Sequence, residues 1–197
     1  IPPKPALRCA VAKSKPRLDG TLDDDAWQRA KPVPLKSLLA DDDAWPAEVK
    51  AAYDDQFLYV AVRCRKVPGL EYPESHGPRP RNADLSGRDR VELYIDLDRD
   101  YATWYQLAMD HRGWVAESCW GDMSWNPTWF VAQAADDQSW TIETAIPLDQ
   151  LTGAYPGPRA VWAVGIQRIV PGVGFQSWTQ PAAIEVLPEG FGWLMFD

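Results

Sequence analysis

The sequence predicts an all-β fold: an antiparallel β-sandwich of the jelly-roll or immunoglobulin-like two-sheet type, with one short N-terminal helix. Apolar and polar residues alternate in many short segments, which is the period of a half-buried strand. Turn-forming residues separate these segments about every ten residues, and helical signals are almost absent. The 197 residues, 46% of them hydrophobic, fit one domain over residues 1–197. The predicted strands are residues 6–12, 33–35, 47–53, 57–65, 90–98, 104–110, 114–120, 128–135, 139–145, 159–170, 177–181 and 191–196.

Elements in the N-terminal part follow from cap and proline signals. Thr21 or Asp23 can cap a short helix that runs to about Ala30, with Trp27 anchoring it to the domain. Prolines in and beside residues 33–35 favour an edge position, where a missing N–H is tolerated.

A hairpin and a long loop follow. Residues 47–53 and 57–65 alternate around a turn and predict a β-hairpin, whose second strand is apolar enough to be central. Residues 66–88 are rich in proline, glycine and charge and have no periodicity. Loops of this length are usually functional or disordered.

The central hairpin presents a polar face. In residues 90–98 every second side chain is aliphatic, and the side chains between them are charged or tyrosine. Residues 104–110 continue the pattern, so the two runs predict an antiparallel hairpin with one face in the core. Its polar face presents Glu92, Tyr94, Trp104, Gln106 and Asp110. In residues 159–170 the same alternation points Trp162 inward and Gln167 outward.

Charge and composition narrow the classes of ligand. A net charge of −8 argues against nucleic acid and anionic membrane surfaces, whereas it permits neutral ligands and cations. No apolar run approaches the roughly 20 residues of a membrane span. The sequence opens on Ile1-Pro-Pro, without a signal peptide, and resembles a mature or trimmed N-terminus. Eleven tryptophans against five phenylalanines are typical of surfaces that stack on flat ligands, although most are expected in the core.

The three cysteines leave two interpretations open. Cys9 and Cys64 lie on predicted strands and could form one disulfide, with Cys119 as a free thiol. Alternatively, all three are unpaired thiols. Their spacing matches no zinc site.

Several segments, in order, resemble the family 9 carbohydrate-binding module and its DOMON relatives. They include Leu18-Asp-Gly-Thr-Leu-Asp-Asp-Asp-Ala-Trp27 and Asp89-Arg-Val-Glu-Leu-Tyr-Ile-Asp96. The full set is residues 18–27, 52–62, 89–96, 105–107, 140–147, 165–168, 177–181 and 191–194. The resemblance covers nearly the whole chain and implies a secreted, non-catalytic β-sandwich, extracellular, periplasmic or on the cell surface. It further implies association with glycoside hydrolases and polysaccharide degradation.

The resemblance also implies a site. In the family a sugar end lies between two tryptophans and is hydrogen-bonded by polar strand residues. Glu92 and Gln167 match such positions, and Asp110 stands where an asparagine is expected. The tryptophan clamp is not matched: Ser86 occupies one position, and the other falls near Glu185 or Val186.

Other side chains are predicted to contribute to a carbohydrate site. Arg88 and Arg168 can bond ligand hydroxyls or pair with the acids, and Trp178 lies beside the predicted groove. A stacking surface is expected from Trp104, Trp120 or Trp125 in place of the clamp.

Asp96, Asp98 and Asp100 place hard oxygen donors at alternate positions, which suits calcium, the ion that braces loops in the family. The run lacks the glycine and terminal glutamate of an EF-hand, so a solvated turn is the competing interpretation.

The alternatives to sugar binding are a sandwich that kept its fold as a structural or protein-interaction module, and a haem-binding domain. Haem would use Met109 and His76, as in some DOMON relatives. Catalysis by Glu92 with Asp110 as an acid/base pair is disfavoured, since modules of this family bind sugars without cleaving them.

Overall fold

The computed structural model describes residues 3–39, 43–179 and 185–197. Within these ranges it contains twelve strands, one short helix and two 3-10 turns. In chain order they are β1 (Ala6–Val11), α1 (Asp25–Arg29), β2 (Val33–Ser37), β3 (Ala47–Tyr53), β4 (Phe57–Arg65), β5 (Arg90–Asp96), β6 (Tyr105–Asp110), β7 (Val115–Cys119), β8 (Phe130–Ala135), β9 (Ser139–Pro147), η1 (Leu148–Gln150), β10 (Val161–Val170), β11 (Gly174–Ser177), η2 (Pro188–Gly190) and β12 (Gly192–Phe196). None of the helices in these ranges is long and apolar enough to cross a membrane.

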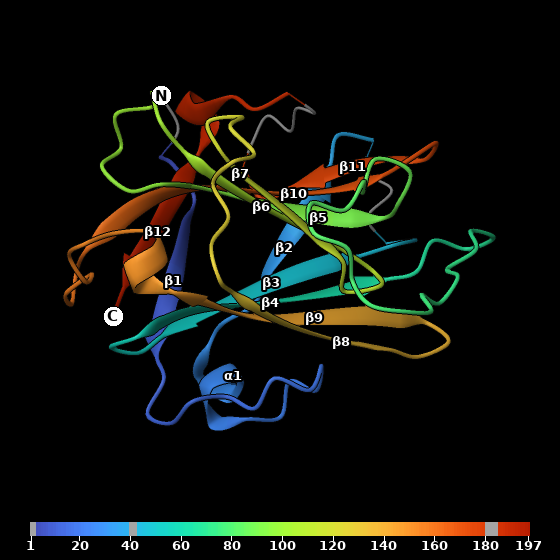
Figure 1. Cartoon of the computed structure of the whole chain (residues 1–197), viewed down its shortest axis with the longest axis horizontal. Coiled ribbons are helices and arrows are strands. Elements are labelled where there is room, and N and C mark those ends of the chain that lie inside the picture. Colours follow the sequence, from blue (N-terminus) through green and yellow to red (C-terminus); the bar gives the residue numbers. More distant parts are fainter. Residues whose placement is uncertain (1–2, 40–42, 180–184) are drawn as a thin grey trace.

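The strands form two layers that pack face to face (Figure 1). Sheet A has the order β7-β6-β5-β10, and β11 and β12 pair with opposite halves of β10. Sheet B has the order β2-β3-β4-β9-β8, with β4 between its two neighbours as predicted. All pairings are antiparallel except those of β1, so the predicted antiparallel β-sandwich is confirmed.

Two strands cross from one sheet to the other. β1 pairs with β12 and then with β3, while β2 pairs with β3 through Val33–Leu35 and with β11 through Lys36–Ser37. The predicted edge position of residues 33–35 is confirmed, because they pair with β3 alone at the edge of sheet B, which explains why Pro34 is tolerated there. The strand continues past the predicted range to Ser37, where it joins sheet A.

The main core fills the space between the sheets. Leu93, Ile95, Leu107 and Met109 lie in it, as the alternation of the central hairpin predicted. Fully burying a side chain of this size contributes about 1.5–3 kcal/mol, so these two strands are held firmly by their inner face. Their outer face remains available for other contacts.

The helix α1 covers the outer face of sheet B (Figure 1). Trp27 is fully buried there, and its indole Nε1–H donates to Glu143 Oε1 at 2.6 Å. The predicted caps Thr21 and Asp23 are wrong: the helix begins after Asp24, whose carboxylate accepts from the backbone N–H of Arg17. That hydrogen bond ties the preceding turn to the helix.

The C-terminal part departs from prediction in one place. β11 ends at Ser177, and the predicted strand 177–181 extends into residues outside the described ranges. The predicted closing strand is present as β12 and pairs with β10 and β1.

Candidate functional site

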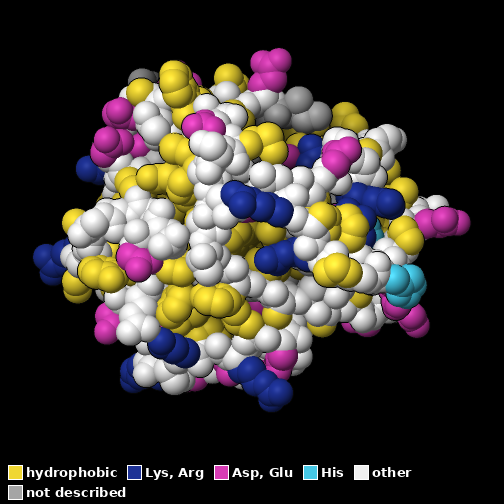
Figure 2. Space-filling model, in the orientation of Figure 1, with side chains coloured by type: hydrophobic (Ala, Val, Ile, Leu, Met, Phe, Trp, Pro, Cys, Tyr) yellow, Lys and Arg dark blue, Asp and Glu magenta, His cyan; other side chains and the backbone are white. Residues whose placement is uncertain are grey.

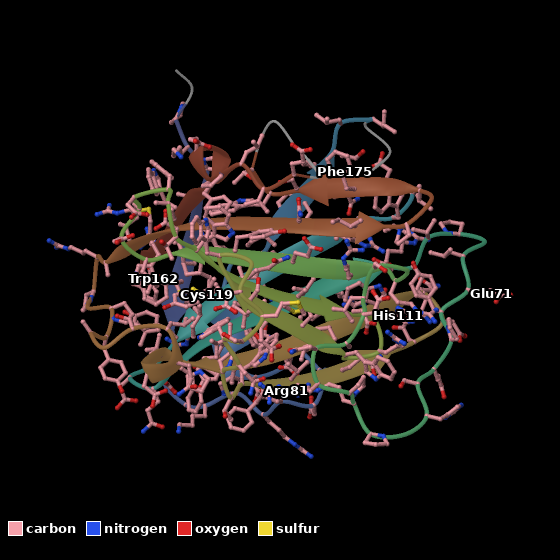
Figure 3. All side chains as sticks on the ribbon, turned by 45° about the horizontal axis from the view of Figure 1, so that its top comes forward. Glu71, Arg81, His111, Cys119, Trp162 and Phe175 are labelled. Carbon is pink, nitrogen blue, oxygen red and sulfur yellow. The ribbon has the colours of Figure 1, made fainter. Side chains whose placement is uncertain are left out.

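A row of polar side chains crosses the outer face of sheet A. In Figure 3 this sheet lies in front of sheet B, with its outer face toward the viewer. Gln167 of β10 lies opposite Glu92 of β5, Tyr94 lies opposite Gln106 of β6, and Gln106 lies opposite Ser118 of β7. Neighbouring side chains in these strands point into the core, so the row occupies the face that alternation predicted to be polar.

Hydrogen bonds join the row around the carboxylate of Glu92. Arg90 Nε donates to Oε1 at 2.7 Å, Gln167 Nε2 donates to Oε2 at 2.9 Å, and the Tyr94 hydroxyl also donates to Oε2. Gln106 Nε2 lies 3.3 Å from the Tyr94 hydroxyl. Burial raises the pKa of Tyr94, and the charge of Glu92 raises it further, so the phenol stays a proton donor.

A pocket of about 360 Å³ opens next to this network, at its Tyr94 and Gln167 side chains. Tyr94 and Gln167 contribute to it from the sheet, and Thr179, Val186 and Phe191 contribute from the segments around it. Its volume lies in the range of small-molecule sites.

Gly165 shapes the wall of the pocket. A Cβ atom at this position would lie 2.5 Å from Cε1 of Phe191, so the ring lies directly against the strand. The Phe191 ring also stacks with Tyr94, with centroids 6.0 Å apart. Together the two rings form an aromatic wall beside polar groups, which is the combination that a sugar ring requires.

Asp110 was predicted on the same polar face, but its carboxylate organises the β6–β7 turn. It is fully buried and accepts from Arg112 Nε at 2.8 Å and Nη2 at 2.6 Å. The backbone N–H groups of Arg112 and Trp114 donate to its other oxygen. Both oxygens are therefore engaged within the turn and are not directed at the pocket.

Two predicted ligand contacts lie on the inner side of sheet A. Arg168 is fully buried and makes a bidentate pair with Asp89, at 2.9 and 2.6 Å. The carbonyls of Trp45 and Arg65 accept from its Nη1 and Nη2, respectively. Trp178 is buried in the main core. The geometry thus assigns Arg168 and Trp178 to the framework of the sandwich.

Trp104 and Arg88 lie nearer to the predicted face. Trp104 packs against the cluster of Tyr94, Ala163 and Phe191, on the outer face. Arg88 is partly exposed, and no hydrogen bond or ion pair joins its side chain to another described residue.

The positions of the missing clamp lie beside this site. Ser86 is exposed, and its carbonyl accepts from Arg90, the partner of Glu92. Val186 lines the pocket and packs against the Tyr94–Phe191 cluster, while Glu185 is exposed at its rim. None of these positions carries an aromatic ring in this chain.

The loop of residues 66–88 borders the face without covering the whole of it (Figure 3). Ala83 and Leu85 pack against Ala108 of β6. Tyr72 anchors the other end of the loop by donating to Asp89 at 2.8 Å.

Sequence reasoning missed three contributors to the site. Arg90 lies two residues before Glu92 on the same strand, so its side chain points to the same outer face. Strand alternation would therefore have placed it beside Glu92. Thr179 and Phe191 come from loops, whose position no sequence period encodes.

The three aspartates at the end of β5 lie together. Each of Asp96, Asp98 and Asp100 has an oxygen within 4.8 Å of the others. Asp96 also accepts from the N–H groups of Arg99 and Tyr101, both of which have positive φ. Burial raises the pKa of Asp96, and the neighbouring Asp98 raises it further.

The remaining candidates lie apart from the pocket. Cys9, Cys64 and Cys119 are all unpaired thiols, so of the two interpretations above the structure favours the one without a disulfide. Met109 is buried in the core, whereas His76 is exposed in the long loop.

Residues 18–171 match the model of a family described as "Carbohydrate family 9 binding domain-like". The chain belongs to this family.

Solved structures agree in fold. A family 9 carbohydrate-binding module from Caldicellulosiruptor kristjanssonii, solved with glucose and with cellotriose, is 15% identical with a TM-score of 0.70. In the glucose complex the match covers 98% of this chain and 96% of that one. A candidate carbohydrate-binding protein from Bacteroides uniformis is 12% identical with a TM-score of 0.72, over 98% of this chain and 100% of the other. No curated protein matches the chain.

Proposed function

We propose that this chain is a non-catalytic carbohydrate-binding module that holds a neutral saccharide in the pocket above Glu92, Tyr94 and Gln167. The observation that carries the proposal is the hydrogen-bond network at the base of that pocket. The sugars bound to the structural relative from Caldicellulosiruptor kristjanssonii, glucose and cellotriose, define the ligand class to test first.

The network has capacity for a sugar hydroxyl. A carboxylate offers about four acceptor positions, and Arg90, Tyr94 and Gln167 occupy three at Glu92. A hydroxyl that donates to the remaining position would make a charge-assisted hydrogen bond. The apolar face of the same sugar ring would lie against Phe191.

The charge around the pocket favours a neutral ligand. Glu185 and Glu189 are exposed residues of its lining, and Arg90 is already paired with Glu92. A sugar acid would be repelled by these carboxylates, whereas a neutral sugar would not. Glucuronate is therefore expected to bind more weakly than glucose.

A binding role fits these acids better than catalysis. A glycosidase requires two carboxyl groups that flank one bond. The Glu92 carboxylate accepts hydrogen bonds from three side chains, and the Asp110 carboxylate pairs with Arg112 within the β6–β7 turn. We extend the proposal to a role outside the cytoplasm in polysaccharide degradation, beside a glycoside hydrolase domain.

Isothermal titration calorimetry with glucose and cellotriose tests the function. We expect wild-type binding and a loss of at least about tenfold in affinity for Glu92→Gln, since a hydrogen bond to a charged group contributes about 1.5–3 kcal/mol. Glu48→Gln, on β3 of the other sheet, is the matched control and should leave binding unchanged. If no saccharide in a broad panel binds, the module is a structural or protein-interaction domain instead.

We also propose a calcium ion at Asp96, Asp98 and Asp100. Their oxygens are close enough to share one cation, and carboxylates are the ligands that calcium prefers. The ion would supply charge compensation and fix the loop between β5 and β6, which leads to Trp104.

A further inference from the structure

The turn that follows β7 has an unusual residue in a demanding position. Trp120 and Gly121 both have positive φ, 50° and 80°. The N–H of Cys119 donates to the carbonyl of Asp122 at 3.1 Å, and the reverse bond measures 2.9 Å. This is the geometry of a two-residue type I′ hairpin turn.

A tryptophan at the first central position of such a turn works against local stability. That position needs a left-handed backbone, which favours asparagine, aspartate or glycine over a bulky side chain. Burial does not compensate, because Trp120 is 66% exposed, the largest exposed fraction of any aromatic side chain among the described residues. Both the left-handed backbone and the exposed apolar ring of Trp120 cost free energy. Residues that are retained despite such costs are typical of functional positions.

Trp120 lies beside the aromatic side of the candidate site. Its backbone N–H donates to the carbonyl of Trp104 at 2.8 Å, which extends the β6–β7 pairing by one step. Trp104 in turn packs against Tyr94 and Phe191. Phe191, Tyr94, Trp104 and Trp120 thus form a series from the pocket beside β10 to the end of β7. The last residue of β7, Cys119, is labelled in Figure 3.

The polar row runs alongside these rings. It extends from Gln167 and Glu92 through Gln106 to Ser118, whose hydroxyl lies 3.3 Å from Gln106 Oε1. From β10 to β7 there are three inter-strand steps, about 14 Å in all. This distance exceeds a single sugar ring, so one monosaccharide cannot use the whole row.

The other two tryptophans that were predicted to stack on a ligand, Trp104 and Trp125, pack against other side chains of the protein. Trp125 packs against the core, with its ring centroid 4.6 Å from that of Tyr105, and Trp104 is partly buried in its cluster.

Figure 2 shows the surface in the view of Figure 1. Exposed hydrophobic side chains and a few basic ones occupy the middle of this view, while acidic side chains lie mainly toward its outline.

We propose that Trp120 is a second stacking subsite, so that the ligand is an oligosaccharide lying across strands β10, β5, β6 and β7. This inference rests on the proposed function and extends it from a sugar unit to a chain. A neutral oligosaccharide would place one unit in the pocket above Glu92 and a more distant unit on the exposed indole of Trp120. Binding along the chain would take the place of clamping one sugar end between two tryptophans. Such a clamp is missing here, because Ser86 and Val186 stand where aromatic residues would be needed.

The test compares glucose with cellohexaose by isothermal titration calorimetry on three variants. Trp120→Asn removes the ring and suits the left-handed backbone, Trp120→Phe keeps a ring, and Phe130→Ala removes an exposed aromatic ring from sheet B. We expect wild type to bind cellohexaose about tenfold more tightly than glucose. Trp120→Asn should lose that difference, keep its glucose affinity and unfold at an equal or higher temperature. The other two variants should keep the difference.

The possible failures are distinguishable. If wild type binds neither sugar, the proposed function falls and this inference falls with it. If glucose binds but Trp120→Asn keeps the full preference for cellohexaose, only the second subsite is refuted. A Trp120→Asn variant that also loses glucose, or that unfolds at a lower temperature, would contradict a separate subsite on an unfavourable turn.

Discussion

Replacing Asp89 by asparagine should remove a large fraction of the stability of this fold. Asp89 is 3% exposed and accepts four hydrogen bonds. Two come from Arg168, one from the Tyr72 hydroxyl at 2.8 Å and one from Trp140 Nε1 at 3.0 Å. These partners belong to β10, the long loop and β9, so one carboxylate joins both sheets and the loop beside the site.

The expected loss follows from the burial of the pair. Arg168 is fully buried, and Asp89 is the carboxylate with which it forms an ion pair among the described residues. Removing one partner of a buried pair leaves an uncompensated charge and costs about 3–5 kcal/mol. Domains of this kind are stable by about 5–15 kcal/mol, so the variant should lose at least about a fifth of that.

Urea denaturation followed by tryptophan fluorescence measures the effect. Asp25→Asn is the control, because its i,i+4 pair with Arg29 is 44–49% exposed and should contribute less than about 0.5 kcal/mol. Combining Asp89→Asn with Arg168→Met should restore part of the stability, since the orphaned charge is then gone. A loss below about 1 kcal/mol for Asp89→Asn alone would refute this reasoning.

Three further predictions concern pH, calcium and the pocket wall. Burial raises the pKa of Glu117 above its usual 4.5, so the native state holds that proton more tightly than the unfolded state, and stability should fall as pH rises through the raised pKa. Thermal unfolding of Glu117→Gln should therefore show a flatter pH profile and a higher midpoint at pH 7; an unchanged profile would exclude Glu117 as the cause. Millimolar calcium should raise the unfolding midpoint of wild type by at least about 2 °C but leave Asp98→Asn unmoved, and equal shifts would place the ion elsewhere. Gly165→Ala would set a Cβ 2.5 Å from Phe191 Cε1, so calorimetry should find glucose affinity lowered about tenfold; unchanged affinity would remove Phe191 from the site.

Strand alternation predicted most of the architecture. The inward positions of Leu93, Ile95 and Leu107 and the outward positions of Glu92 and Gln167 follow from a period of two, which the sandwich obeys on both faces. The same period, applied one residue further, would have placed Arg168 inward with Ile166. A buried arginine needs a carboxylate partner, and Asp89 at the start of the central strand was available to supply it.

Other features of the site have no local signal. Nothing in residues 185–191 indicates that their loop returns to lie against β10, because loop placement depends on tertiary packing. Proline correctly marked an edge at residues 33–35, but no local signal showed that β2 continues to Ser37 and changes sheets there. The unusual Trp120-Gly121 turn is visible only once both φ angles are known.

A crystal structure of the wild-type chain soaked with cellotriose would show directly whether the pocket beside Glu92 and Gln167 binds a saccharide. We expect a sugar unit with a hydroxyl within hydrogen-bond distance of the Glu92 carboxylate and the Gln167 amide, and with its ring against Phe191. The rest of the ligand should run from this pocket toward β7. Density for the sugar away from this face, or an empty pocket at saturating cellotriose, would contradict sugar binding at this site.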